Sequence, residues 1–249
     1  MKKIISAVLV IVLCFSCSMV TFAEDFNNEE EHSIYKNNEI EERLVYNSTW
    51  FQLLRTSYSG YEAHFTTNTA LESGMGYIYG QETCPNFYIG NSRMSSVGCE
   101  IAATYNAIKL RGFVVPCANI IRSFERNGYL MTAGYLGSDP YAIGDYFDTE
   151  TAYRATEYTD YTTMKNRVEN NISSFNVYIV SFWNSDSIFD GLHTVAFYTE
   201  NGAINIYNYY NNNTSAITKS SFASFVESDK FIVGYFIPRM GRIIENTDN

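Results

Sequence analysis

The feature that most constrains the fold is the change of pattern between the two halves of the chain. The C-terminal half holds four runs rich in β-branched and aromatic residues, parted by Asn, Gly, Ser and Asp, at 175–183, 192–199, 203–209 and 231–237. Such runs predict β-strands. Helical patterns precede them, and helices followed by a run of strands are typical of an α+β domain. We therefore expect helices packed on an antiparallel sheet.

A hairpin is predicted between the second and third of these runs. Asn201-Gly202 at its tip is the strongest short hairpin signal, and a two-residue loop pairs Glu200 with Ala203. Followed along both strands, this register places His193 opposite Tyr210. A slip by one residue would turn every side chain to the other face, so the register is a sharp prediction.

Helical spacing and capping residues predict helices earlier in the chain. Residues 95–98 supply capping chemistry, the apolar positions that follow recur at helical spacing, and Gly112 stands where a helix ends, so Cys99 lies in the first turn. A second helix is expected over 117–127, and a third after the cap and proline at 138–140. Residues 57–94 contain many glycines and are expected to be irregular.

The N-terminus has the pattern of an export signal. Lys2 and Lys3 precede an apolar run over 4–15, and small residues close the segment at Ala23. This pattern predicts a secretory signal peptide over 1–23, too short to span a bilayer, and a secreted protein that stays off the membrane after cleavage. Cys17 leaves a lipoprotein as the alternative, although the usual residues before such a cysteine are missing.

Residues 24–56 are expected to form an acidic leader that ends in a helix over about 39–56. Nothing in the pattern decides whether this helix belongs to a propeptide or to the domain. Residues 57–249 are then expected to form a single domain, the candidate catalytic domain. A net charge of −10 repels nucleic acid and favours a cationic partner, such as a basic peptide or a cell-wall amine.

Three cysteines remain after signal cleavage: Cys84, Cys99 and Cys117. Because three is odd, at least one thiol has no partner within the chain. A bridge between Cys84 and Cys117 is left open. Cys99 is the candidate nucleophile, because a helix N-terminus lowers the pKa of a thiol. The alternative is a small buried residue at a helix start.

His193 is the candidate base. Of the other histidines, His32 lies in the acidic leader and His64 in the stretch expected to be irregular. Asn208 shares the face of Tyr210 in the predicted hairpin and lies diagonally across from His193, within side-chain reach. Its carboxamide could accept the imidazole N–H and hold the ring toward a thiolate. The alternative is that Asn208 begins a polar turn.

The order Cys99, His193, Asn208, with the cysteine on an early helix and the other two on a later sheet, resembles the papain-like cysteine peptidases. The chain is most similar to bacterial peptidases that process bacteriocin leaders, through MSSVGCEIAATYNAIKLRG (94–112), GSDPYAIGDYF (137–147) and GLHTVAFYTENGAINIYNYY (191–210). The resemblance implies a papain-like fold, a peptide or protein substrate cleaved often after small residues, and no cofactor.

The chain also departs from that family. The family's oxyanion-binding Gln, six residues before the cysteine, is Arg93 here, so Asn91 and the more distant Gln81 are the candidates for the oxyanion hole. Glu100 directly follows the cysteine and would oppose thiolate formation. Two other functions stay open: a cell-wall peptide amidase or endopeptidase similar to the NlpC-type hydrolases, and a catalytically inactive papain-like binding module.

Other chemistries have little support in the sequence. No Cys-x-x-Cys pair or helical His-x-x-x-His predicts a metal site, and we expect none. The lone glycines do not form a phosphate-binding loop. Asp186 and Asp190, close before His193, are interpreted as part of a solvated loop.

Overall fold

The structure is a computed structural model that describes residues 49–151, 154–184 and 191–239. The chain divides into two compact units, Met1–Glu42 and Arg43–Asn249, and every described residue belongs to the second. The predicted signal peptide, most of the acidic leader, and Asp186 and Asp190 lie outside the described residues. No helix in the described ranges has the length and apolar character that crossing a membrane requires.

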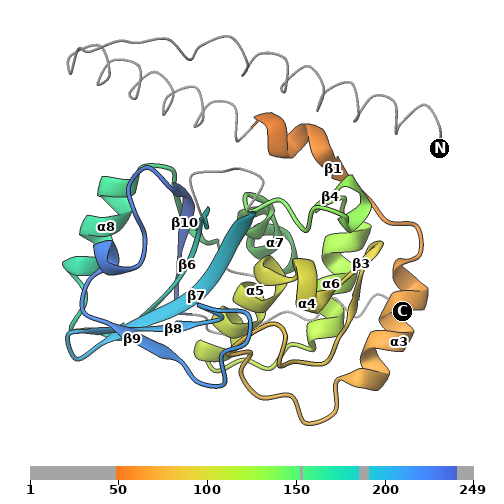
Figure 1. The fold of residues 1–249 in the computed structure, drawn as a ribbon, viewed down its shortest axis with the longest axis horizontal. Helices are drawn as coiled ribbons and strands as arrows, with labels where there is room; N and C mark the ends of the chain where they lie inside the picture. Colours follow the sequence, from red (N-terminus) through yellow and green to blue (C-terminus); the bar gives the residue numbers. More distant parts are fainter. Residues whose placement is uncertain (1–48, 152–153, 185–190, 240–249) are drawn as a thin grey trace, which may run out of the picture. The chain divides into compact units, whose positions relative to one another are not determined.

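The first half of the second unit is mainly helical (Figure 1). After a helical turn at 49–54 come β1 (Arg55–Thr56), α3 (Tyr61–Leu71), β2 (Tyr88–Ile89), β3 (Ser92–Arg93), α4 (Met94–Val97), α5 (Cys99–Leu110), α6 (Cys117–Arg126), β4 (Leu130–Met131), η1 (Thr132–Gly134) and α7 (Ala142–Glu150). The second half holds β5 (Thr156–Tyr158), α8 (Tyr161–Glu169), β6 (Asn176–Trp183), β7 (Leu192–Glu200), β8 (Ala203–Tyr207), β9 (Ile217–Lys219), η3 (Phe222–Ser224) and β10 (Phe231–Ile237).

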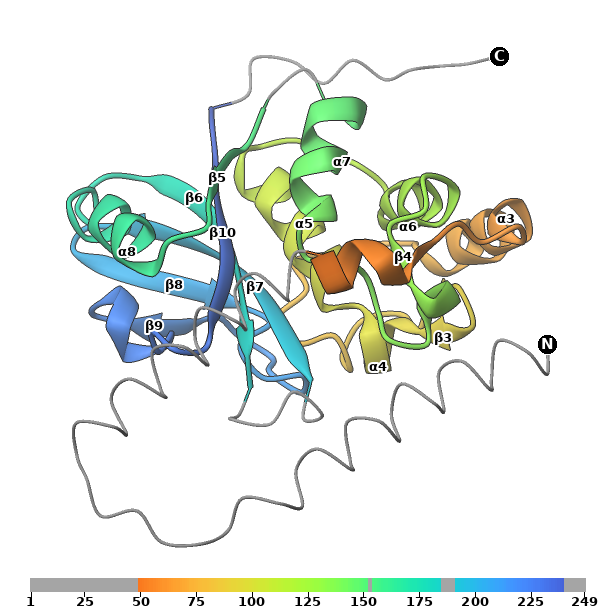
Figure 2. The same cartoon turned by 90° about the horizontal axis from the view of Figure 1, so that it is seen from above.

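The largest sheet has six strands in the order β5-β10-β6-β7-β8-β9, and every neighbouring pair is antiparallel. Helix α5 packs against β6 and β7 on one face, while α8 lies on the other face (Figure 2). The prediction of an α+β fold with an antiparallel sheet is therefore confirmed.

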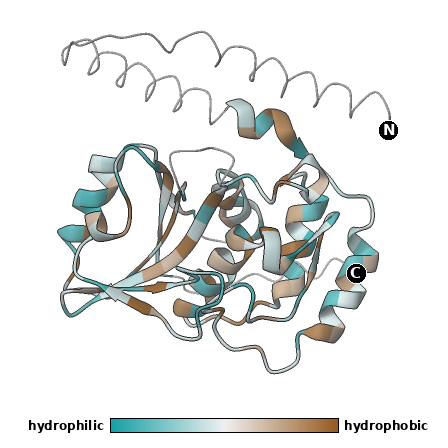
Figure 3. Cartoon of the chain, viewed as in Figure 1, coloured by the Kyte–Doolittle hydropathy of each residue, from teal (hydrophilic) through white to brown (hydrophobic). Residues whose placement is uncertain are grey.

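Side chains alternate along the central strands and contribute to two apolar cores, one on each face of the sheet. On β6, Val177, Ile179 and Trp183 join the core that includes α5, α6 and α7. Tyr178 and Phe182 point the other way, into the core that includes α8. In Figure 3 the hydrophobic colour follows the strands and α5, whereas α8 shows mostly hydrophilic residues outward. Both faces of the sheet are thus buried, which explains the nearly continuous apolar runs in the sequence.

The predicted hairpin register is confirmed, with Glu200 paired to Ala203 and the ladder running to Ala196 and Tyr207. Both loop residues have positive φ, 53° at Asn201 and 80° at Gly202, as the favoured two-residue turn requires. The ladder ends earlier than predicted. Because Asn208 is in the left-handed region (φ 60°), the chain leaves the strand before reaching the position opposite His193.

The three predicted helices are confirmed as α5, α6 and α7. Their predicted caps are wrong at two places: residues 94–97 form α4, and α7 begins at Ala142, after Pro140, without a side-chain cap. The expectation that 57–94 is irregular is wrong at α3. Only Asn68 of this helix is buried, so its sequence carries little apolar periodicity. Contacts with other elements stabilise it instead: the Asn68 amide pairs with the Tyr88 backbone, and Glu62 forms an ion pair with Arg122 on α6. Of the helix predicted over 39–56, the described part is helical at 49–54.

Candidate active site

Cys99 is the first residue of α5, as predicted. The short helix α4 ends just before it, and Gly98 forms the joint between the two helices. A Cβ at position 98 would meet the sulfur of Met94 and lie 2.7 Å from its carbonyl oxygen, so the joint requires glycine. The N–H groups of the first helical turn have no partners inside the helix and favour an anion.

The thiol of Cys99 lies against β7 beside His193. Its Sγ is 3.9 Å from the carbonyl oxygen of Leu192 and makes a backbone contact with Thr194, the two neighbours of His193 in the strand. Within the described residues, no strand pairs with this part of the β7 edge, because β8 stops pairing at Ala196. The early end of β8 therefore makes room for the sulfur at the strand edge.

The side-chain partner of the thiol is Glu100. Cys99 Sγ donates to Glu100 Oε1 at 3.3 Å, and the same oxygen accepts from the Thr194 hydroxyl at 3.1 Å. The hydroxyls of Thr194 and Ser181 are 2.9 Å apart, which extends the chain of hydrogen bonds to β6. All four side chains are buried, with Glu100 only 1% exposed.

Burial and this pairing shift both titrating groups. Desolvation raises the pKa of Glu100 to about 7, against the lowering effect of its hydrogen bonds. Desolvation also raises the pKa of Cys99 well above its ordinary value, and the charge and hydrogen bond of Glu100 raise it further. These effects exceed the lowering expected from the helix N-terminus. The thiol is therefore protonated in this arrangement, and the expectation that Glu100 opposes ionisation is confirmed.

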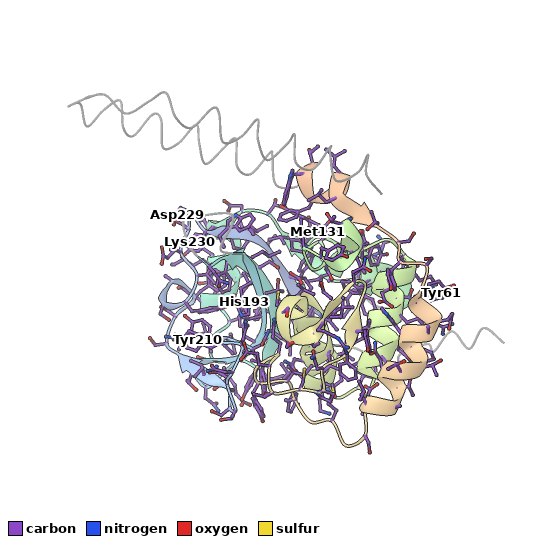
Figure 4. All side chains as sticks on the ribbon, turned by 45° about the vertical axis from the view of Figure 1, so that its right-hand side comes forward. Tyr61, Met131, His193, Tyr210, Asp229 and Lys230 are labelled. Carbon is purple, nitrogen blue, oxygen red and sulfur yellow. The ribbon has the colours of Figure 1, made fainter. Side chains whose placement is uncertain are left out.

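The imidazole of His193 is held in place through its Nε2 atom. Nε2 lies 2.5 Å from the backbone carbonyl oxygen of Asn208, and the ring packs edge-on against Phe182. Figure 4 shows His193 on β7, the strand that α5 packs against. Burial lowers the pKa of the imidazole, so the ring is neutral at neutral pH. Because a carbonyl oxygen only accepts, Nε2 carries the proton and Nδ1 carries the lone pair. The backbone of Tyr209 also contacts the imidazole.

Within the described residues, no hydrogen bond joins Cys99 to His193. Alternation along β7 explains this. Thr194 turns its side chain toward α5, where it contacts Glu100, whereas His193 starts from the opposite side of the strand, next to Phe182. The Cys99 sulfur lies at the edge of β7, between the side of Thr194 and the side of His193. Its thiol hydrogen bonds to the Glu100 carboxylate rather than to the imidazole.

Asn208 contacts His193 through its backbone and not, as predicted, through its carboxamide. The carboxamide instead pairs with Gln81: Oδ1 accepts the Gln81 backbone N–H at 2.8 Å, and Nδ2 donates to Gln81 Oε1 at 3.1 Å. The Asn208 backbone N–H donates to Tyr79. Asn208 is thus a buried clamp between the histidine and the 79–81 segment. The predicted side-chain contact fails because the strand ends at Tyr207.

The two oxyanion candidates lie in different places. Gln81 is buried beside Asn208, and its Nε2 donates to the carbonyl oxygen of Ser95, in the short helix before Cys99, at 3.2 Å. Asn91 is exposed, and its amide donates to Ala133. The structure therefore connects Gln81 with the Cys99–His193 region and does not connect Asn91 with it.

All three described cysteines, Cys84, Cys99 and Cys117, are free thiols, so the bridge left open above is not formed. Across the described ranges, no group of three or more His, Cys, Asp or Glu side chains is arranged to hold a metal ion.

Thr194, Ser181 and the contact between Asn208 and Gln81 were not predicted from the sequence. For Glu100 the sequence predicts only that it opposes ionisation of the thiol. The available signal was its place inside an apolar helix, since a buried carboxylate needs partners. No local pattern predicts which distant hydroxyls supply them.

Comparisons with protein-family models, curated proteins and solved structures found no match to this chain.

Proposed function

We propose that this protein is a secreted thiol hydrolase of papain-like type, in which Cys99 attacks peptide bonds and His193 acts as its base. One observation carries the proposal. The sulfur at the start of α5 contacts both strand neighbours of a histidine whose Nε2 is bonded to the Asn208 carbonyl oxygen at 2.5 Å. The residues that we propose as nucleophile, base and orienting group thus belong to three distant segments that contact one another at β7.

The tautomer of His193 suits this role. With Nε2 protonated, Nδ1 accepts the thiol proton when the sulfur turns from Glu100 toward the ring. The thiolate attacks the peptide carbonyl carbon, His193 returns the proton to the leaving amine, and water then hydrolyses the acyl-enzyme. The lowered pKa keeps the imidazole available as a base at neutral pH. The Asn208 backbone performs the orienting role that was predicted for its side chain.

The oxyanion of the tetrahedral intermediate needs two donors. The backbone N–H of Cys99, in the first turn of α5, is one. We assign the second to the Gln81 side chain, which the Asn208 carboxamide holds in place. In the resting structure Gln81 Nε2 donates to Ser95, so this amide must turn toward the substrate. Removal of one such donor costs on the order of 10²-fold or more in kcat.

The test is hydrolysis of a panel of unstructured peptides by the full-length protein, with Cys99→Ala as the decisive variant. We expect Cys99→Ala to abolish hydrolysis and iodoacetamide labelling at that site, and Cys84→Ala to keep both. Hydrolysis retained without Cys99 would end the proposal. Purified peptidoglycan assayed alongside the peptides distinguishes a cell-wall substrate. Mass spectrometry of the mature N-terminus tests export.

A second candidate function is a binding module that keeps this fold without the chemistry. It is favoured by the thiol–carboxyl hydrogen bond at Cys99 and by the raised pKa of that thiol. The discriminating observation is the reactivity of Cys99. A sulfur that does not react with iodoacetamide at any pH at which the protein stays folded would favour the binding module.

A further inference from the structure

The buried carboxyl group of Glu100 has no role in the mechanism above, yet it is the side-chain hydrogen-bond partner of the nucleophile. It lies on the first turn of α5, where its other contact is the Thr194 hydroxyl on β7. Gly137 lies near the second oxygen, and a Cβ there would stand 3.8 Å from Oε2, an ordinary van der Waals distance. The carboxyl group therefore lies among three segments of the chain and is hydrogen bonded to α5 and β7.

The charges around Glu100 are negative or neutral. On its own helix the titrating neighbour is Cys99, and from the segment before α7 the neighbour is Asp139. Asp139 forms an ion pair with Arg55, 2.5 Å away. The partners on β7 and β6, Thr194 and Ser181, do not titrate in the usual pH range. Glu100 is thus a carboxylate stabilised by neutral donors alone.

The two protonation states of Glu100 affect the sulfur in opposite ways. A carboxylate only accepts hydrogen bonds, so it binds the protonated thiol and repels a thiolate. A carboxylic acid can donate, so at the same 3.3 Å it would hydrogen bond to a thiolate and no longer repel it. We propose that Glu100 controls the reactivity of Cys99, holding the thiol protonated when ionised and releasing it to ionise when neutral.

As a regulation of the proposed hydrolase, this inference rests on the proposed function, and it predicts that activity stops rising with pH once Glu100 ionises. The transition is expected near pH 7, because burial raises the pKa of Glu100 to about 7. The lowered pKa of His193 keeps the base neutral below that pH. Below the pKa of Glu100 the activity falls because fewer Cys99 thiols ionise, and above it the carboxylate keeps the activity from rising further.

The experiment measures alkylation of Cys99 by iodoacetamide in the full-length protein from about pH 5 to about pH 9, by mass spectrometry of the peptide that contains it. For the wild type we expect the rate to rise about tenfold per pH unit up to about pH 7 and then to flatten, as two coupled groups require. In Glu100→Gln the amide imitates the neutral acid, so the rise continues without flattening. At pH 8 the variant should react at least about tenfold faster.

Two further variants control this result. Glu125→Gln changes another buried glutamate, on α6, and should leave the Cys99 profile unchanged. Thr194→Val removes one hydrogen bond to the carboxylate and should move the flattening to higher pH, which keeps the inference testable if Glu100→Gln does not fold.

A Glu100→Gln profile equal to the wild type, or slower at pH 8, would overturn the inference, as would a Thr194→Val profile that does not move. Peptide hydrolysis is measured separately. If the alkylation profiles hold and no peptide is cleaved, the proposed function fails and the control by Glu100 stands.

Discussion

Glu100 and Glu125 are both buried glutamates, on the neighbouring helices α5 and α6, but they differ in their partners. Glu125 Oε1 accepts the Gly90 backbone N–H at 2.7 Å and lies 2.7 Å from Nδ1 of His64. Among the described residues, the side-chain partners of the Glu100 carboxyl group are a thiol and a hydroxyl, and its own backbone also hydrogen bonds to it. Burial raises the pKa of both carboxyl groups.

The difference shows how similar burial serves two purposes. The Glu125 site joins α3, α6 and the β2–β3 turn, with the His64 ring stacked between Tyr58 and Tyr88. The Glu125 carboxyl group contacts a backbone N–H and an imidazole from two other segments, so the site is suited to holding the helices together. Among the described residues, no imidazole hydrogen bonds to Glu100. Its carboxylate is easily neutralised, and that change is transmitted to the adjacent sulfur.

The largest effect on stability is expected at the Glu125 site. Glu125→Ala leaves the Gly90 N–H and His64 without their acceptor and opens a cavity, at a cost of about 3–5 kcal/mol in the free energy of unfolding. Urea unfolding at neutral pH measures it. A loss below about 1 kcal/mol would show that this site does not hold the helices together.

The next effect is the pH dependence that Glu100 gives to folding. Because its pKa is raised from 4.5 to about 7, the folded state binds this proton more tightly than the unfolded state. Its contribution is fully present below pH 4.5 and is lost as pH rises through about 7. The loss is about 3 kcal/mol. The free energy of unfolding, measured with urea, should fall between pH 5 and pH 8, and in Glu100→Gln this fall should be smaller by about 3 kcal/mol. An equal fall in both proteins would contradict the assignment.

A smaller effect is expected from the clamp at Asn208. Asn208→Ala removes both carboxamide hydrogen bonds to Gln81 and places alanine at a positive φ, which together should cost about 2 kcal/mol. The backbone contact with His193 remains, so kcat should fall through the loss of the Gln81 donor while the pH dependence of the histidine stays the same. A shift in that pH profile would show that the side chain acts on the imidazole after all. Gln81→Ala is the matched variant.

Thr194→Val should have the smallest effect on stability, on the order of 1 kcal/mol, because it removes the hydroxyl's hydrogen bonds to Glu100 and Ser181 without a change of volume. Differential scanning calorimetry at pH 8 resolves such a change as a few degrees in Tm. A destabilisation as large as that of Glu125→Ala would make the Glu100 site a structural one, like its counterpart on α6.

Local chemistry in the sequence was enough for much of the framework. Asn201-Gly202 determined the hairpin and its register, because its backbone suits a two-residue turn. The helical spacing of apolar residues predicted that Cys99 lies in the first turn of a helix, although no side chain caps that helix. Helix α3 was not predicted because its sequence lacks apolar periodicity. It is stabilised by contacts with α6 and with the Tyr88 backbone, which are far from it in the chain.

Only the tertiary structure decided the contacts of the candidate site. The end of β8 at Tyr207 determined that Asn208 meets His193 through its carbonyl oxygen and Gln81 through its side chain. Packing of α5 on β7 determined that the thiol meets Glu100. Hydrogen bonds of this kind join residues far apart in the chain, and their geometry depends on how the elements pack, which no local pattern in the sequence records.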